Sequence, residues 1–228
     1  MRMATEVVPD RGYAIYENIL DAADMSDLLQ TLSASGISRT RAGARHLLGV
    51  AAVRALAFDH RLLAIARQFV SDGAVPYRAT LFDKSPTSNW LVVWHQDTAL
   101  PLREHVETTG WGPWSVKAGI TYAHAPAAAL QKIIALRVHL DDSTSTNGPL
   151  RVLPDTHTFG VLSDDRLLEL AGRIRPVNCV AASGGVVAMR PLTVHASSKV
   201  TGDQPRRVLH IEYAASLQVG DNLVLAEA

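Results

Sequence analysis

The sequence of 228 residues has a single cysteine, no long apolar run and no excess of either charge. The lone Cys179 cannot form a disulfide within the chain. No stretch approaches the roughly 18 apolar residues of a membrane-spanning helix, and the first residues lack the apolar run of a signal peptide. Lys and Arg together number 22, as do Asp and Glu, which argues against binding to nucleic acid or to an anionic membrane. We therefore expect a soluble cytoplasmic protein.

Apolar residues are plentiful by contrast, at 47% of the chain, which is enough for a sizeable core. No linker or internal repeat divides the sequence, so we predict a single domain over residues 1–228. Apolar positions at intervals of three and four predict a helix over residues 21–32 and two helices over residues 45–70, broken near Asp59. These helices make up a predicted N-terminal layer of about residues 1–75.

From about residue 76 the pattern changes to short β-prone runs separated by turn residues. A short helical insertion is expected over residues 162–173. Many short strands at modest spacing are typical of a β sandwich or barrel. The predicted fold is mainly β with N-terminal helices, and its β core of about residues 76–215 is a closed or double-sheet domain, such as a jelly roll. The strands are expected over residues 77–83, 90–94, 118–124, 133–140, 150–153, 185–189 and 207–214.

Candidate metal ligands come from four of the nine histidines, which are followed two residues later by Asp or Glu. About one such pair is expected by chance if acidic residues fill roughly a tenth of positions, so the pattern alone is a weak signal. Two histidines and one carboxylate on one face of Fe(II) leave three positions open for a co-substrate and dioxygen. Residues i and i+2 of an extended segment point to the same side, so one segment can supply two ligands. The pairs are His95/Asp97, His105/Glu107, His139/Asp141 and His210/Glu212.

A third ligand must come from a distant strand, and His195 is a candidate because it follows the apolar run 185–189. A keto acid that chelates iron needs a cation for its far carboxylate, and an arginine matches a carboxylate bidentately. Arg206 and Arg207 follow on the next predicted strand, where only one of them can point inward. A polar cavity wall favours Arg206, which shares a face with His210, but the periodicity does not decide between them.

Three segments resemble the phytanoyl-CoA dioxygenase family of Fe(II)- and 2-oxoglutarate-dependent oxygenases: LFDKSPTSNWLVVWHQD, LRVHLDDSTSTNGPLRVLPDTHTFG and MRPLTVHASSKVTGDQPRRVLHIEY. They span about residues 77–213 in the family's order. A Lys-x-Pro turn precedes His-x-Asp, and Asn-Gly-x-Leu-x-Val-Leu-Pro follows. Last comes a His with Ser two residues on and Arg eleven residues on. The resemblance implies a double-stranded β-helix (jelly roll, cupin-like) and hydroxylation of a small organic metabolite, with release of succinate and CO2.

The resemblance also implies a metal site. It places the Fe(II) ligands at His95, Asp97 and His195, and it adds no catalytic residue beyond them. Halide-transferring relatives lack the carboxylate that Asp97 supplies, which favours hydroxylation over halogenation. The implied partners are a small-molecule substrate and O2, and a monomer or homodimer is expected.

For 2-oxoglutarate, the resemblance implies that Arg206 binds the far carboxylate and that Ser197 donates a hydroxyl beside it. Thr80 and Arg137 occupy positions that face the co-substrate in relatives. From the residues alone, Arg137 either faces the cavity or pairs with a carboxylate in the core, because its charge is costly to bury unpaired.

Two further expectations concern residues near this site. Lys84, before Ser85-Pro86, is interpreted as a solvated turn lysine. Trp111 and Trp114 lie in a loop-like segment and are candidates to line the substrate site, although core packing is the default for tryptophan.

Rival interpretations remain open at this point. His139/Asp141 is the strongest alternative ligand pair, although Asp141 leads directly into a turn. His105/Glu107 is interpreted as a solvated loop, and His210/Glu212 as cavity lining or plain strand. The rival functions are a metal-binding cupin of another class, such as an isomerase or a 2-oxoglutarate-independent dioxygenase, and a catalytically silent binding protein. The first would not need Arg206, and the intact ligand set argues against the second.

Overall fold

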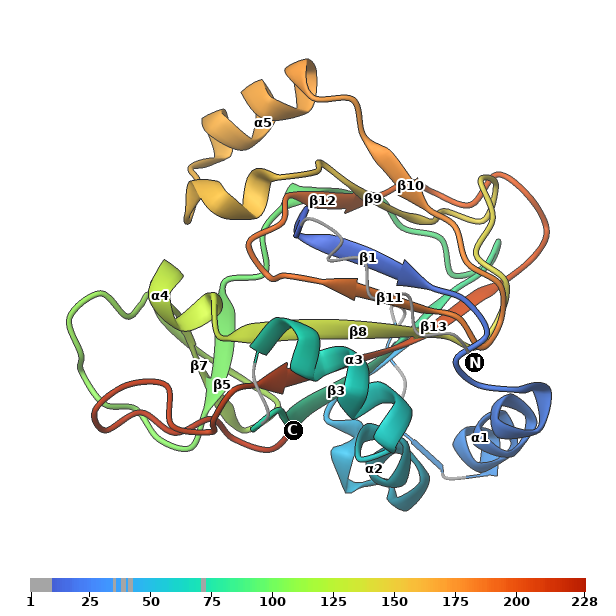
Figure 1. Cartoon of the computed structure of the whole chain (residues 1–228), viewed down its shortest axis with the longest axis horizontal. Helices are drawn as coiled ribbons and strands as arrows, with labels where there is room; N and C mark the ends of the chain where they lie inside the picture. Colours follow the sequence, from blue (N-terminus) through green and yellow to red (C-terminus); the bar gives the residue numbers. More distant parts are fainter. Residues whose placement is uncertain (1–9, 35, 38–39, 41–42, 71–72) are drawn as a thin grey trace.

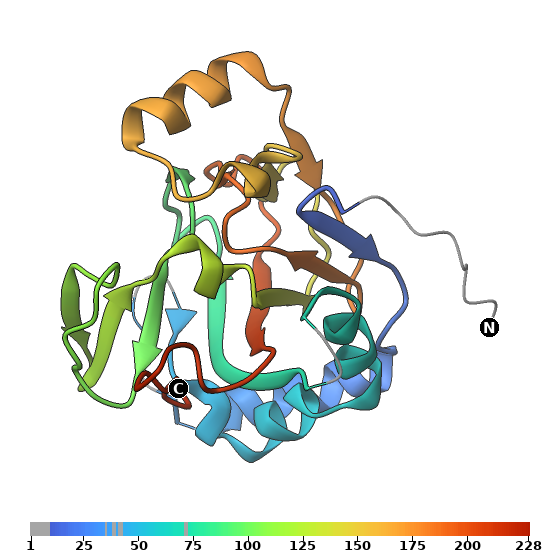
Figure 2. The same ribbon diagram turned by 60° about the vertical axis from the view of Figure 1, so that its left-hand side comes forward.

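The computed structural model in Figure 1 describes residues 10–34, 36–37, 40, 43–70 and 73–228. Two antiparallel sheets stack over a shared interior, and a third, smaller sheet flanks them (Figures 1 and 2). The prediction of a mainly β fold with N-terminal helices is confirmed. Residues 1–9, which begin the predicted helical layer, lie outside the described residues. Among those described, no helix combines the length and apolar character needed to span a lipid bilayer.

The largest sheet has six strands in the order β1-β11-β8-β13-β3-β2. They are β1 (Tyr13–Tyr16), β2 (Gly43–Ala44), β3 (Val75–Lys84), β8 (Ile133–His139), β11 (Val186–Met189) and β13 (Arg206–Ala214). The second sheet has the order β10-β9-β12-β4. It consists of β4 (Val92–His95), β9 (Leu150–Val152), β10 (Val177–Cys179) and β12 (His195–Ser197). The flanking sheet, in the order β5-β7-β6, consists of β5 (Ala99–Leu102), β6 (Trp114–Lys117) and β7 (Ile120–His124).

Three helices cover the outer face of the six-stranded sheet: α1 (Ala22–Ala34), α2 (Ala51–Ala57) and α3 (His60–Val70). They follow the predicted segments, including the break near Asp59. The predicted insertion is present as α5 (Asp164–Arg173), which the Ser163 hydroxyl caps by accepting a bond from the Arg166 amide. The remaining helical segments are α4 (Ala127–Leu130) and two short 3-10 helices, Leu47–Gly49 and Thr156–Phe159.

The strands of the six-stranded sheet carry different chemistry on their two faces, because successive residues of a strand point to opposite sides. Leu81, Leu136 and Leu209 face outward and are buried against α1, α2 and α3. Their neighbours Thr80 and Arg137 face the interior and line a cavity. One alternating pattern therefore supplies both the hydrophobic core and a polar cavity wall.

Six of the strands were not predicted from the sequence: β1, β2, β5, β6, β10 and β12. None of them is longer than four residues. One of the six, β12, lies between β4 and β9, and this pairing places His195 directly opposite His95.

Candidate metal centre

His95, Asp97 and His195 come together in the cavity between the two stacked sheets. Each offers one ligand atom, and these atoms all lie within 4.8 Å of one another. The Asp97 carboxylate is 3.7 Å from Nε2 of His95 and 3.5 Å from Nε2 of His195. The two imidazole centroids are 4.1 Å apart. Ligands from two strands thus converge on one point.

Hydrogen bonds to the backbone orient both imidazoles. Nδ1 of His95 lies 2.8 Å from the carbonyl oxygen of Val93, and Nδ1 of His195 lies 2.8 Å from that of Thr193. A carbonyl can only accept, so each Nδ1 carries the proton and each Nε2 is left as a ligand. Burial lowers the pKa of His195 to about 4, so its ring is neutral at pH 7, as metal binding requires. This donor set fits Fe(II).

Gln96, between His95 and Asp97, anchors the segment that directly follows β4. Its amide nitrogen donates to the carbonyl oxygens of Gly160 and Leu192, at 2.9 and 2.7 Å. Its amide oxygen accepts a bond of 2.8 Å from the Leu162 backbone. The residue between the ligands is therefore anchored to two loops, and this supports the position of Asp97.

The rival carboxylates have other partners. Asp141 forms an ion pair of 2.6 Å with Arg207, and Glu107 pairs with the histidine two residues before it at the surface. Glu212 is buried and pairs with Arg78. In the part of the chain that the structure describes, the His95, Asp97 and His195 group is the one suited to a metal ion.

Arg206 lines the same cavity as the three ligands and is only 2% exposed. Its Nε donates to the Asn147 carbonyl oxygen at 3.3 Å, and its Nη2 lies 3.5 Å from the Ser197 hydroxyl. Its buried Nη1 has no hydrogen-bond partner among the described residues. Arg207 points away from the cavity toward Asp141. The inward-facing arginine is thus Arg206, and it has a donor to offer an anion.

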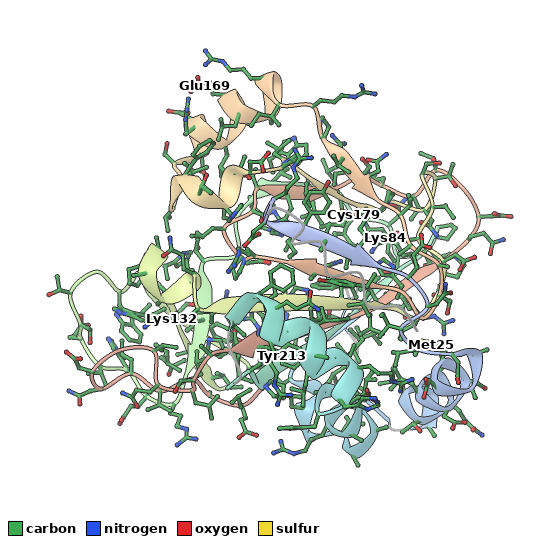
Figure 3. All side chains as sticks on the ribbon, viewed as in Figure 1. Met25, Lys84, Lys132, Glu169, Cys179 and Tyr213 are labelled. Carbon is green, nitrogen blue, oxygen red and sulfur yellow. The ribbon has the colours of Figure 1, made fainter. Side chains whose placement is uncertain are left out.

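Lys84 lies beside Arg206, and the interpretation of Lys84 as a solvated turn residue is wrong. β3 continues through Lys84 and pairs it with Arg206, which draws the side chain fully into the interior (Figure 3). Its ammonium donates to the Ser197 hydroxyl and the Ser198 carbonyl oxygen, both at 2.8 Å, and lies 5.0 Å from the centre of the Trp90 ring. Burial lowers the pKa of Lys84 to about 7, and the charge of Arg206 adds to the shift.

Thr80 and Arg137 also line the cavity, which has a volume of about 340 Å³. Nη1 of Arg137 lies 3.2 Å from Nδ1 of His210, and its guanidinium lies 5.3 Å from the centre of the Phe82 ring. Its buried Nε lacks a partner in the described parts of the chain. Of the two alternatives for Arg137, the structure shows the one in which it faces the cavity.

Comparison with known proteins places this site in a family. A family model described as "Phytanoyl-CoA dioxygenase (PhyH)" matches residues 9–208, which is most of the sequence. The chain belongs to the phytanoyl-CoA dioxygenase family. The resemblance inferred from the three sequence segments is therefore confirmed. No curated protein sequence matches the chain significantly.

Solved structures share the fold of this family member at low sequence identity. EvdMO1 is 21% identical with a TM-score of 0.67 over 90% of this chain and 47% of its own. EctD from S. alaskensis, in its apoform, is 23% identical with a TM-score of 0.65 over 90% and 74%. HygX from Streptomyces hygroscopicus, with nickel and 2-oxoglutarate bound, is 16% identical with a TM-score of 0.63 over 90% and 83%. The chain thus spans less than half the length of EvdMO1. The double-stranded β-helix is confirmed.

Trp111 and Trp114 are not among the residues that line the cavity of this family member. Trp114 lies in β6 rather than in a loop, and its ring centroid is 4.2 Å from that of His105. Both tryptophans pack on the apolar cluster around Leu100 and Leu102. The aromatic residues on the cavity wall include Trp90 and Tyr122 instead. The expected substrate-lining role of Trp111 and Trp114 thus has no support in this geometry.

The buried Lys84 leads to a prediction about pH. Its pKa is lowered from 10.5 to about 7 on folding, so between these values the unfolded chain binds more protons than the folded one. Titration of Lys84 therefore makes the free energy of unfolding rise as the pH increases from about 7 to about 10. Below pH 7 this residue is protonated in both states and adds no dependence on pH. Urea denaturation at pH 7, 8 and 9 is expected to show this rise in the wild type and not in Lys84→Met.

The exposed Lys132 offers a matched control for this experiment (Figure 3). Lys132→Met is expected to keep the pH dependence of the wild type. If the free energy of unfolding changed with pH in the same way in Lys84→Met and in the wild type, the ammonium of Lys84 would not be buried beside Arg206.

Proposed function

We propose that this chain hydroxylates a small organic metabolite, using Fe(II), O2 and 2-oxoglutarate and releasing succinate and CO2. The observation that carries the proposal is that one cavity contains both the His95, Asp97 and His195 group and the buried cations Arg206 and Lys84. The two histidines and the aspartate suit a metal ion, and the buried cations suit a carboxylate. A 2-oxo acid with a second carboxylate at its far end needs both. HygX, which shares the fold, is described with nickel and 2-oxoglutarate bound.

In this proposal His95, Asp97 and His195 hold Fe(II), which with 2-oxoglutarate and O2 supplies the oxidising power to hydroxylate a C–H bond. The chain orients the reactants. Arg206 offers Nη1 to the far carboxylate of 2-oxoglutarate. The Ser197 hydroxyl donates to the Gly148 carbonyl oxygen at 2.8 Å rather than to the co-substrate, and it positions the two cations by accepting from Lys84 and Arg206. These charge-assisted contacts are strong because the groups are buried.

Arg137 and Thr80 complete the proposed co-substrate site. They lie on β8 and β3, at positions that both pair with His210 of β13, and all three residues line the cavity. Burial lowers the pKa of His210 well below its usual value, so the ring stays neutral beside Arg137. The site therefore keeps its positive charge mainly on the arginines, and its only lining carboxylate among the described residues is the proposed metal ligand Asp97.

Measuring succinate formation with each component omitted in turn tests the proposed function. We expect slow succinate formation without added substrate that requires Fe(II), 2-oxoglutarate and O2, and faster formation when a substrate is found by screening. A protein that binds the metal but consumes no 2-oxoglutarate under any of these conditions would instead belong to a metal-binding cupin class of different chemistry.

A further inference from the structure

A second group of cations lies near Tyr122 on the cavity wall, apart from Arg206 and Lys84. The Lys117 ammonium lies 5.0 Å from the centre of the Tyr122 ring, and the Arg78 guanidinium lies 5.8 Å from it. The Tyr122 hydroxyl is 3.0 Å from Nε2 of His46, which directly follows Arg45. Arg45, Arg78, Lys117 and Tyr122 all line the cavity. We call these four residues the Tyr122 cluster.

The Tyr122 cluster is assembled from segments far apart in the sequence. Arg45 directly follows β2, and Arg78 lies on the neighbouring strand β3. Lys117 ends β6, and Tyr122 lies in β7. Figure 2 shows the flanking sheet of β5, β6 and β7 at one side of the molecule, opposite β1. The cluster therefore lies where the flanking sheet meets the edge of the six-stranded sheet.

Most of the positive charge in this cluster is not neutralised. Arg78 pairs with Glu212, but within the described residues neither Arg45 nor Lys117 has an ion pair. Partial desolvation lowers the pKa of the exposed Lys117, and the charges of Arg45 and Arg78 lower it further. Three cations are thus held close together against their mutual repulsion.

The rest of the cavity does not supply the missing negative charge. Among the described residues that line it, six are Lys or Arg and one, Asp97, is acidic. A divalent metal ion and a doubly charged 2-oxoglutarate together add no net charge. The excess of positive charge therefore persists when both are bound, and Arg206 and Lys84 already account for the far carboxylate of the co-substrate.

We propose that the substrate carries a compact anionic group, a carboxylate or a phosphate, which binds between Arg45 and Lys117 above Tyr122. This inference names the substrate class of the proposed function and rests on it. Arg78, fixed by Glu212 and by its contact of 3.4 Å with the Ala99 carbonyl oxygen, lies behind this group. The uncharged part of the substrate extends from the Tyr122 cluster toward the metal ligands. Arg45 and Lys117 are exposed at the cavity mouth, where they can attract an anion from solution.

Equilibrium binding of three compounds that share one hydrocarbon chain tests the proposal without turnover. We would measure dissociation constants of hexanoate, pentyl phosphate and the uncharged hexanamide by ligand-observed NMR, with Zn(II) and saturating 2-oxoglutarate present. At least one of the two anions is expected to bind about tenfold or more tighter than hexanamide, because a hydrogen bond to a charged group is worth more than a neutral one. The anion that binds tighter identifies the group. Equal binding of all three compounds would overturn the proposal.

Matched double variants locate the binding. Arg45→Gln/Lys117→Gln is expected to remove the preference for the anion, while Lys132→Gln/Arg175→Gln, with the same change in net charge at exposed sites outside the cavity, is expected to retain it. An equal loss in both double variants would show a long-range charge effect and overturn the proposal. Failure of the proposed function would appear separately, as absent succinate formation with this anion preference intact.

Discussion

Replacing His195 with alanine is expected to abolish Fe(II)-dependent succinate formation and to weaken metal binding by roughly 100-fold or more. Losing a hydrogen-bond partner of a metal ligand typically costs about 10- to 100-fold in affinity, so the loss of a ligand itself costs at least the upper end of that range. His195 is buried and its Nε2 faces Asp97, and among the described residues the metal-binding group has no fourth member. Metal affinity would be measured by anaerobic equilibrium dialysis.

His105→Ala is the matched control, because His105 also precedes an acidic residue by two positions and forms an ion pair with it at the surface. We expect this variant to bind Fe(II) and to form succinate as the wild type does. If the two variants lost metal to the same extent, or if folded His195→Ala retained wild-type affinity, the metal would be bound elsewhere. Circular dichroism would establish that both variants are folded.

Replacing Arg206 with glutamine is expected to raise the KM for 2-oxoglutarate by about 100-fold. A charge-assisted hydrogen bond contributes roughly 1.5–3 kcal/mol, and about 1.4 kcal/mol corresponds to a tenfold change in affinity. Glutamine retains polar atoms but loses the charge and the bidentate fork of the guanidinium. Metal affinity in the absence of 2-oxoglutarate is expected to stay within about threefold of the wild type, because Arg206 has no contact with the three ligands.

Arg207→Gln, at the adjacent residue, is the control for this second prediction. It removes the same charge from the opposite face of β13 and breaks the ion pair with Asp141, so a modest loss of stability is expected with an unchanged KM. A normal KM for 2-oxoglutarate in Arg206→Gln would mean that the co-substrate is bound without this arginine. That outcome would contradict the proposed role of the buried arginine.

The alternation of residues along the longer strands explains how much of the site could be predicted from the sequence. In β13, Arg206 shares a face with His210, and the polar character of that face favoured Arg206 over Arg207 as the inward residue. The structure shows this arrangement, since Arg206 lines the cavity and Arg207 binds Asp141. Strand periodicity is local information, so a single sequence contains it.

The buried position of Lys84 could not be predicted from the residues that surround it in the sequence. The following Ser85-Pro86 suggested a turn, yet β3 extends through Lys84 and pairs it with Arg206. The same alternation that places Thr80 in the cavity, extended by four residues, would have placed Lys84 there. What the sequence could not supply was the end of the strand, which is set by pairing with β13 rather than by the turn residues.

Pairing between distant segments accounts for most of what the sequence did not predict. The three-residue strand β12 has no periodicity to detect, and its position depends on β4 and β9, which lie about 100 and 45 residues earlier in the chain. The Tyr122 cluster likewise combines β2, β3, β6 and β7, of which β2 and β6 were not predicted. Trp114 lies in a strand rather than in the loop that the sequence predicts for the same reason, because β6 exists only through its pairing with β7.

The most direct test of the account is whether the metal ligands and the buried cations act as one site. Isothermal titration calorimetry would measure the affinity for 2-oxoglutarate with and without Mn(II), a divalent ion that accepts the same ligands and avoids turnover. If one co-substrate molecule contacts both the metal and Arg206, we expect one Mn(II) per chain and at least about tenfold tighter binding of 2-oxoglutarate when Mn(II) is present. Equal affinity for 2-oxoglutarate with and without the metal would contradict it.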